Sequence, residues 1–313
     1  MKLFFYRRSN TQPNFGDELN LWLWERLMPG VLDEDDQVAF LGIGTLINSL
    51  LPERIPNAQR LVVLGTGVGY KTGVPTVDDR WMIYALRGPL SALKLGVPNS
   101  LAITDAAVLL RRVYEPTASK RYRFSYMPHF TQSIMAADDW QQICNQLGFG
   151  YIDARWPVDQ VLEAIAQTEV LLTEAMHGAI VADALRVPWV AVQTTPWLLP
   201  FKWVDWCMSI GVDYQAAPIT GLEGLPDHQR IRNIRGVRGS RTAIRESWRY
   251  WVYQTQAKLQ LQRIAQRSRP ILSHASHLEQ LTQQMEEALE RLKADATAGR
   301  FALAAHPQHS PNV

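Results

Sequence analysis

The hydrophobic residues of this chain form short continuous runs that alternate with longer amphipathic segments. The runs have the length of β-strands and lie at about residues 2–6, 37–42, 60–65, 81–86, 100–104, 122–127, 149–153, 169–173 and 188–193. Helical patterns fall between several of them, most clearly at 17–28, 88–95, 138–147, 157–168 and 177–186. Alternation of strand and helix is typical of parallel sheets with helices on both faces, so the pattern predicts an α/β protein with doubly wound, Rossmann-like sheets.

The chain is long enough for two such domains. Its 313 residues exceed the usual size of a single hydrophobic core. A stretch rich in Pro, Ser and Thr at residues 114–120 interrupts the alternation and is the best candidate for a linker. We therefore expect Rossmann-like domains over 1–117 and 118–225, a helical extension over 226–296, and an unstructured tail over 297–313.

The clearest candidate site is His177. An apolar run at 170–172 breaks into a polar turn, and an apolar-periodic helix follows that closes at Pro188. In open α/β sheets, ligands bind where the carboxyl ends of strands face helix amino termini, and anions meet unsatisfied N–H groups there. The pattern places His177 at such an edge; the ordinary alternative is a polar turn residue or a hydrogen-bonded core histidine.

A second site of the same kind opens the chain. The apolar run at 2–6 leads through Asn14, Gly16 and Asp17 into a helical pattern that ends at Pro29. Asp17 therefore lies in the first turn of the first helix. The alternative interpretation of Asp17 is a helix N-cap, because Asp is a preferred capping residue.

Several short motifs, taken in order, resemble the polysaccharide pyruvyltransferase family. They are Asn14-Phe15-Gly16-Asp17-Glu18, Gly42-Ile43-Gly44-Thr45, Arg87-Gly88-Pro89-Leu90-Ser91, Asp105, Met127-Pro128-His129 and Glu174-Ala175-Met176-His177-Gly178-Ala179-Ile180. The likeness covers about residues 1–215 and is strongest to the bacterial exopolysaccharide members. It implies a fold similar to two-domain glycosyltransferases of the GT-B type, and phosphoenolpyruvate as the donor substrate with no separate cofactor.

The chemistry of pyruvyl transfer suggests how these residues divide. Adding a sugar hydroxyl to C2 of an enol needs a proton at C3, a base for the hydroxyl proton, and positive groups for the donor's carboxylate and phosphate. We assign donor contact and the C3 proton to His177, and the base to Asp17, the role that the resemblance implies. The remaining expected donor contacts are Arg87, Lys202, His129, Gly44 and Gly67, and the expected acceptor contacts are Asn14, Glu18, Trp197 and Trp203.

Three of these assignments have ordinary alternatives. Arg87 could form a surface salt bridge, His129 could pack at the linker, and tryptophans such as Trp203 are more often buried than stacked on a sugar. The chain also departs from some relatives, which carry Arg two residues before the histidine where Ala175 stands here. We expect Lys202, in the loop after the 188–193 run, to replace that cation.

Composition excludes several classes of protein. Hydrophobic residues make up 47% of the chain and charged residues 20%, as in an ordinary globular protein. No apolar run of membrane-spanning length and no signal-peptide pattern is present, so we expect a cytoplasmic protein. The two cysteines, Cys144 and Cys207, fit no metal-ligand spacing, and we expect no metal site and no catalytic thiol. The Gly-x-Gly turns lack the dinucleotide fingerprint, so NAD binding is not expected.

Charge is concentrated in one segment. Residues 230–269 hold eleven Arg or Lys residues and one acid, Glu246, in a chain whose formal charge is only +2. One helical face there is mostly apolar and comprises Ile244, Trp248, Trp251, Val252, Thr255, Leu259 and Gln262. The pattern is compatible with a helix wrapped across the two domains or with peripheral contact with the inner membrane surface. No recognised motif supports nucleic acid as a partner.

A later helix with leucines at three- and four-residue intervals could pack on the body or form a homo-oligomer.

The sequence therefore predicts transfer of pyruvate from phosphoenolpyruvate to a sugar of a lipid-linked or growing exopolysaccharide, as a ketal and with release of phosphate. We expect a 4,6-linked ketal. Two alternatives stay open at this point: a nucleotide-sugar-dependent glycosyltransferase on the same architecture, and a non-catalytic glycan-binding or scaffold protein.

Overall fold

The protein folds around two fully parallel β-sheets. The computed structural model describes residues 1–6, 12–69, 73–116, 119–195, 199–223 and 241–302, without the side chains of 241–247. The first sheet has the order β1-β2-β3-β4, with β1 at Lys2–Phe4, β2 at Val38–Leu41, β3 at Arg60–Leu64 and β4 at Trp81–Ala85. The second has the order β6-β5-β7-β8-β9, with β5 at Tyr122–Met127, β6 at Gly150–Tyr151, β7 at Thr168–Thr173, β8 at Trp189–Gln193 and β9 at Ala217–Pro218. The predicted α/β class with parallel sheets is confirmed.

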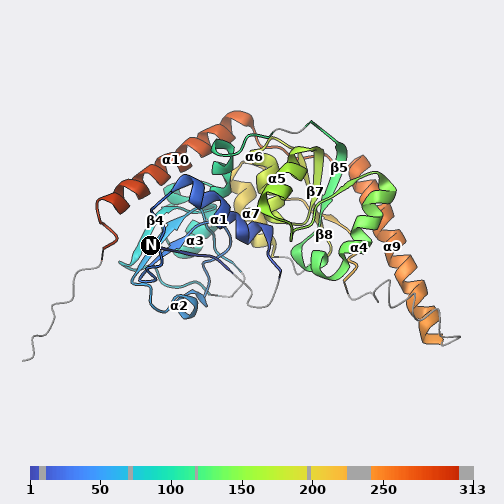
Figure 1. Ribbon diagram of the computed structural model, residues 1–313, viewed down its shortest axis with the longest axis horizontal. Helices are drawn as coiled ribbons and strands as arrows, with labels where there is room; N and C mark the ends of the chain where they lie inside the picture. Colours follow the sequence, from blue (N-terminus) through green and yellow to red (C-terminus); the bar gives the residue numbers. More distant parts are fainter. Residues whose placement is uncertain (7–11, 70–72, 117–118, 196–198, 224–240, 303–313) are drawn as a thin grey trace, which may run out of the picture.

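Helices connect and cover the strands (Figure 1). They are α1 at Phe15–Leu27, α2 at Leu51–Arg54, α3 at Pro89–Leu95, α4 at Phe130–Leu147, α5 at Val158–Ala166, α6 at Met176–Ala184, α7 at Pro200–Ser209, α9 at Arg241–Arg267 and α10 at Ala275–Thr297. Two 3₁₀ segments, η1 at Asn99–Leu101 and η2 at Ala106–Arg112, follow α3. None of the described helices is long and apolar enough to cross a membrane.

The two sheets differ in topology. In the second sheet the chain passes from β5 out to β6 and then back to β7 on the other side of β5, which is the doubly wound order. The first sheet instead adds its strands in one direction only, so the doubly wound order expected there is wrong. The reversal in the second sheet opens a crevice between β5 and β7 at their carboxyl ends, where His129 and His177 follow.

The structure differs from the expected elements at residues 100–104 and at residues 200–209. Residues 100–104 do not form a strand; η1 covers part of them, and Ala102 makes only an isolated bridge to Leu86. The segment after β8 was expected as a loop, but residues 200–209 form α7, which begins with Pro200 at a favoured position for proline. Trp203, Trp206 and Cys207 of α7 recur at helical spacing and are buried, which favours a helix here.

The hydrophobic core is formed by the strands of both sheets and the helices that pack on them. One cluster of buried apolar side chains includes Leu23 of α1, Val161 of α5, Ala179 of α6 and Leu289 of α10. Helix α10 packs against η2 and β4, so the end of the described chain returns to the first sheet (Figure 1). The sheets fall on either side of the expected linker, but the boundary at 117 and 118 lies outside the described residues. The division into domains therefore stays a prediction.

Candidate functional site

A pocket of about 810 Å³ lies where the carboxyl ends of the two sheets face each other. From the first sheet's side it is lined by the segments after β1 and β2, and from the second sheet's side by those after β5, β7 and β8. Its lining includes these polar or charged side chains: Gln12, Asn14, Asp17, Glu18, Thr45, Asn48, Arg54, His129, His177 and Lys202. Both principal residues predicted from sequence, Asp17 and His177, are therefore in one cavity.

The first turn of α1 presents Asp17 to the pocket. Asn14 occupies the N-cap position and Asp17 the third helical position, so the expectation that Asp17 might serve as the cap is wrong. Asn14 Nδ2 donates a hydrogen bond of 2.7 Å to Asp17 Oδ2. The buried Asn20 donates to the Asp17 carbonyl and to the Ile43 carbonyl at 3.1 Å each, and so ties this turn to the segment after β2. Asp17 is half-buried, and its carboxylate is oriented by Asn14.

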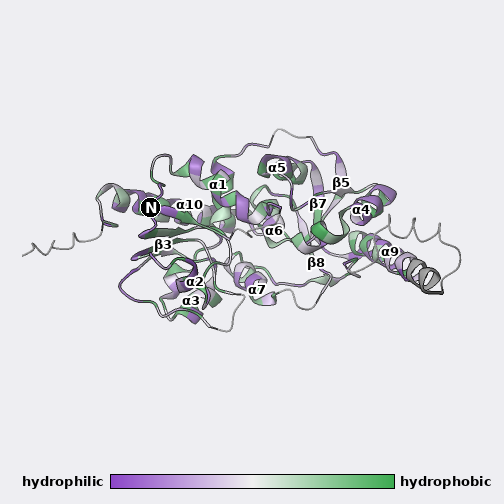
Figure 2. Cartoon of the chain, turned by 60° about the horizontal axis from the view of Figure 1, so that its bottom comes forward, coloured by the Kyte–Doolittle hydropathy of each residue, from purple (hydrophilic) through white to green (hydrophobic). Residues whose placement is uncertain are grey.

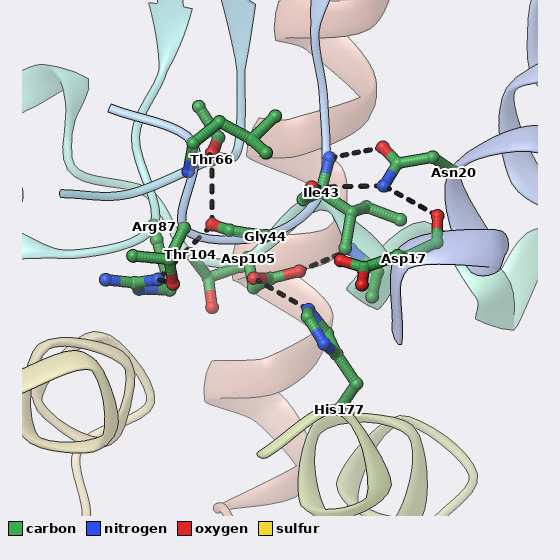
Figure 3. Close-up of polar contacts among 12 residues, drawn as sticks. Asp17, Asn20, Ile43, Gly44, Thr66, Arg87, Thr104, Asp105 and His177 are labelled. Atoms are coloured by element: carbon green, nitrogen blue, oxygen red, sulfur yellow. Dashed lines mark hydrogen bonds and ion pairs between the residues drawn. The ribbon is translucent and has the colours of Figure 1, made fainter. Parts of the chain in front are cut away.

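His177 lies in the first turn of α6, and its ring fits between two residues from the other side of the pocket. Its Nε2 is buried and lies 3.8 Å from Asp105 Oδ2. Figure 3 shows the imidazole of His177 pointing toward the Asp105 carboxylate. On the other side is Gly16 of α1, where an added Cβ would lie 2.2 Å from His177 Nδ1. Glycine at position 16 is what allows the imidazole to pack directly against α1.

Asp105 is a site residue to which sequence reasoning gave no role, although it is one of the motif residues. Its carboxylate is fully buried; Oδ1 accepts from the Ala107 amide at 3.0 Å, and Oδ2 has no hydrogen-bond partner within the described structure. A buried carboxylate oxygen aimed at an imidazole nitrogen favours one orientation of the ring. The sequence offered one signal for Asp105, because this residue follows the apolar residues 101–103 as Asp17 follows the apolar run at 2–6.

Glu174 holds together three segments at the crevice of the second sheet. Its Oε1 accepts from the amide and the hydroxyl of Thr194, at 2.5 and 2.6 Å, and its Oε2 accepts from the His129 amide at 3.2 Å. The side chain is buried, and the burial raises the pKa of this carboxyl above its usual value. Glu174 therefore fixes the turn before α6.

His129 caps α4 by accepting from the Thr131 amide, and it lines the pocket.

Arg87, which we expected from the sequence to contact the donor, does not line the pocket. Arg87 is fully buried and pairs with Asp205 of α7 at 3.1 Å. Its remaining donors bind the Gly44 carbonyl, the Thr45 hydroxyl at 2.8 Å and the Val68 carbonyl at 3.0 Å. All of its hydrogen-bonding capacity is thus used within the protein. Arg87 positions the Gly44-Thr45 turn, which does line the pocket.

Gly67 is likewise misassigned. It is not among the residues that line the pocket, and an added Cβ there would lie 2.3 Å from the Arg87 guanidinium carbon. Gly67 makes room for that guanidinium. Gly44, by contrast, lines the pocket and has a φ of 120°, a conformation that favours glycine.

Among the residues that the structure describes, two basic side chains besides the histidines line the pocket. Lys202 lies in the first turn of α7, and it is in the cavity as expected, although on a helix instead of a loop. Arg54, at the end of α2, was missed by sequence reasoning because α2 is too short to give a periodic pattern. Its side chain is exposed, and the guanidinium carbon lies 5.1 Å from the centre of the Tyr6 ring. These cations face the same space as Asp17 and Glu18.

The proposed sugar-stacking tryptophans do not serve that purpose where the structure describes them. Trp203 is 2% exposed, packs against Trp189, Trp206 and Tyr214, and does not line the pocket. Its burial follows from the helical spacing of the apolar residues in α7. Trp197 lies outside the described residues. Asn14 and Glu18, the other expected acceptor contacts, line the pocket.

Neither Cys144 nor Cys207 has the environment of a reactive thiol. Both cysteines are free and buried, and burial raises the pKa of the Cys207 thiol to about 12, which disfavours the reactive thiolate. In the part of the chain that the structure describes, no three His, Cys, Asp or Glu side chains are grouped to hold a metal ion. Metal-independent activity stays a prediction.

Comparison with known proteins bears on what this pocket does. The family model of polysaccharide pyruvyl transferases matches residues 6–195, which include every described pocket residue except Leu199 and Lys202. The chain belongs to the polysaccharide pyruvyl transferase family. It is also 42% identical over 218 residues to the succinoglycan biosynthesis protein ExoV of Rhizobium meliloti (strain 1021). That alignment covers 69% of this chain and 66% of ExoV, so the chain spans just under two thirds of its relative's length. The family recognised from the motifs is confirmed, and its description as a family of transferases agrees with the predicted class of enzyme.

Proposed function

We propose that this protein transfers pyruvate from phosphoenolpyruvate to a sugar of a lipid-linked or growing exopolysaccharide, forming a ketal and releasing inorganic phosphate. The observation that carries the proposal is the arrangement of the pocket. A carboxylate from α1 and an imidazole backed by a buried carboxylate enter the same cavity from opposite sheets, and Arg54 and Lys202 line it. Family membership and the part that ExoV plays in succinoglycan biosynthesis support the same assignment.

The reaction needs two successive C–O bonds to C2 of the donor. In the first step, which is an addition, a sugar hydroxyl oxygen bonds to C2 while C3 gains a proton and becomes a methyl group, and the hydroxyl proton leaves to a base. In the second step, which is a displacement, another hydroxyl of the same sugar bonds to C2 and gives its proton to a base, while the bond from C2 to the phosphate oxygen breaks and phosphate departs with the electron pair. Each step benefits from a base near the hydroxyl, and the first requires an acid near C3.

We assign these roles to residues on the two walls of the pocket. Asp17 accepts the hydroxyl proton, since its carboxylate lies in the pocket and is oriented by Asn14. His177 donates a proton to C3, and Asp105 faces its Nε2 across 3.8 Å and orients the ring. Lys202 and Arg54 supply positive charge for the donor's carboxylate and phosphate, and His129 contacts the donor through the ring nitrogen that does not cap α4. Gly44 allows the anion to approach the backbone of its turn.

The setting of the reaction is part of the same proposal. We place the enzyme in the cytoplasm at the inner membrane surface, where a lipid-linked acceptor is accessible, with no cofactor and no metal. The ketal would join O4 and O6 of one sugar. A GT-B-like arrangement of two α/β domains with parallel sheets is the fold we infer, and association of two copies is a further expectation.

The proposal is tested by a product assay. The protein is incubated with phosphoenolpyruvate and lipid-linked oligosaccharides, and released phosphate is measured together with the mass of the acceptor. We expect phosphate release that depends on the acceptor, and an acceptor mass increased by one pyruvate ketal. Transfer of a sugar from a nucleotide sugar would show a glycosyltransferase instead, and glycan binding without turnover would show a binding protein.

A further inference from the structure

Helix α9 has two apolar faces on opposite sides. The inner face contains Tyr250, Ala257, Leu261 and Ile264, which are buried in the described structure. This face packs against α4, where Tyr250 donates a hydrogen bond to Asp139 and Lys258 bonds Gln146 at 2.8 Å. Because these residues recur at intervals of three, four and seven, they form one continuous stripe along the helix. The inner face alone therefore accounts for the attachment of α9 to the body.

The outer face is also apolar, and nothing in the described structure covers it. Its residues are Trp248, Trp251, Val252 and Leu259, which are 66%, 50%, 37% and 54% exposed. This is the face that the sequence singled out, and the alternative in which it packs across the two halves of the molecule is wrong, since the opposite face does the packing. Exposed apolar surface of this kind marks a contact with a partner. Figure 1 shows that α9 extends away from the sheets beyond α4.

Basic side chains flank the outer face. On a helical projection, Arg249, Arg263 and Arg267 fall on one edge of the apolar stripe, and all three are exposed. Lys258 lies at the opposite edge. The helix as a whole, residues 241–267, contains six Arg or Lys residues and one acid, Glu246. Its hydropathy pattern is visible in Figure 2, where purple and green residues occur together along α9.

We propose that the outer face of α9 is a membrane-binding surface that lies in the headgroup region of an anionic bilayer. Tryptophan side chains favour the boundary between headgroups and acyl chains, and arginines beside them contact lipid phosphates. A second copy of this helix is a poorer partner, because two strongly basic helices packed through this face would bring like charges together. The surface therefore has the charge and the apolar residues that an anionic membrane requires, independently of what the pocket catalyses.

Sedimentation with vesicles tests this surface. The full chain is mixed with vesicles of phosphatidylcholine containing 30% phosphatidylglycerol, or with phosphatidylcholine alone, at low and high salt. We expect binding to the anionic vesicles that weakens with salt. Arg249→Gln with Arg263→Gln should lower the partition coefficient by about 30-fold, since each basic residue at such a surface contributes about fivefold. Trp248→Ala with Trp251→Ala should lower binding to a similar extent.

The control is a matched pair of changes elsewhere on the surface. Leu93→Ala with Arg123→Gln removes one exposed apolar and one exposed basic side chain from other elements and should bind vesicles like the unchanged protein. All variants alter exposed side chains, so each should keep the unchanged melting temperature within a few degrees, which is measured in parallel. Failure of the unchanged protein to bind anionic vesicles would overturn the proposal. So would a stable dimer in light scattering that the tryptophan changes dissociate. Vesicle binding is measured without phosphoenolpyruvate, so its outcome is separate from that of the proposed function.

Discussion

At the scale of single residues, the position of His177 depends on a residue with no side chain. The imidazole packs against the backbone of Gly16 on one side and faces Asp105 on the other. These contacts come from α1, α6 and η2, which are far apart in sequence. The ring is therefore held by the tertiary structure, and its orientation is sensitive to small changes on either side.

Gly16→Ala should displace the imidazole. A Cβ at this position would lie 2.2 Å from Nδ1, so His177 must move, and a displacement near 1 Å at a reacting group costs about 10²-fold in rate. We expect kcat to fall by about that factor, with a modest loss of stability of about 1–3 kcal/mol. Gly73→Ala is the control, because its Cβ would meet Ser49 at an ordinary 3.5 Å. Unchanged kcat in Gly16→Ala would show that the placement of His177 does not matter for turnover.

Asp105→Asn tests the buried carboxylate. Asparagine keeps the shape and still accepts from the Ala107 amide, but it removes the carboxylate charge that faces His177 Nε2. We expect kcat to fall by up to about 10²-fold, because the imidazole loses the carboxylate that orients it. The KM for phosphoenolpyruvate should change little. A kcat equal to that of the unchanged enzyme would leave Asp105 with a purely structural role.

The sequence could predict which residues line the pocket only where the neighbouring residues determine the position of the side chain. Asp17 and His177 were found because each follows an apolar run and opens a helix. Arg87 has the same local pattern, but its role is decided by Asp205, which lies 118 residues away in sequence. Arg54 belongs to a helix of four residues that leaves no periodic signal. Burial and long-range pairing therefore decide which of the expected residues line the pocket and which do not.

At the scale of elements, α7 is fixed to the first sheet through one buried ion pair. Asp205 accepts from Arg87, and also from the Ser91 amide and hydroxyl at 3.0 and 2.6 Å. Because Lys202 is on the same helix, this network also positions a pocket cation. Element prediction succeeded for the buried parallel strands, whose apolar runs are nearly continuous. It failed for α7, whose tryptophans were interpreted as ligand contacts.

Arg87→Met should destabilise the protein strongly. Removing one partner of a buried pair leaves Asp205 without its counter-charge, which typically costs about 3–5 kcal/mol. We expect a reduced free energy of unfolding in chemical denaturation. Arg80→Gln, which breaks an exposed pair with Asp78, should change stability by less than about 1 kcal/mol. A stable Arg87→Met protein that has lost phosphoenolpyruvate binding would instead make Arg87 a donor ligand.

At the scale of the whole molecule, the pocket exists because the carboxyl ends of two sheets face each other. The sequence predicted the sheets and the residues at their ends, since each depends on local periodicity. It did not predict the strand order of the first sheet or the direction in which α9 faces, because both depend on which surfaces pack together. The apposition of the sheets brings side chains from the two halves of the chain into one cavity.

Chelation tests the expected absence of a metal requirement. We expect phosphate release from phosphoenolpyruvate to continue after dialysis against EDTA, since the proposed roles are all filled by side chains. Activity is compared before and after dialysis, and again after adding Mg²⁺, Mn²⁺ or Zn²⁺. Loss of activity in EDTA that a divalent ion restores would show that the pocket has been assigned the wrong chemistry.

We propose that the pocket binds phosphoenolpyruvate through His177 and that Asp17 acts only after the donor has bound. Thermal unfolding, measured with and without phosphoenolpyruvate, separates these two roles when the unchanged protein is compared with His177→Ala and Asp17→Asn. A ligand at a hundredfold excess over its dissociation constant adds about 2.7 kcal/mol of stability, which is a measurable shift. We predict a shift for the unchanged protein and for Asp17→Asn, which should nevertheless be nearly inactive, and little or no shift for His177→Ala. Stabilisation by a nucleotide sugar and not by phosphoenolpyruvate, or an equal shift in all three proteins, would contradict the account.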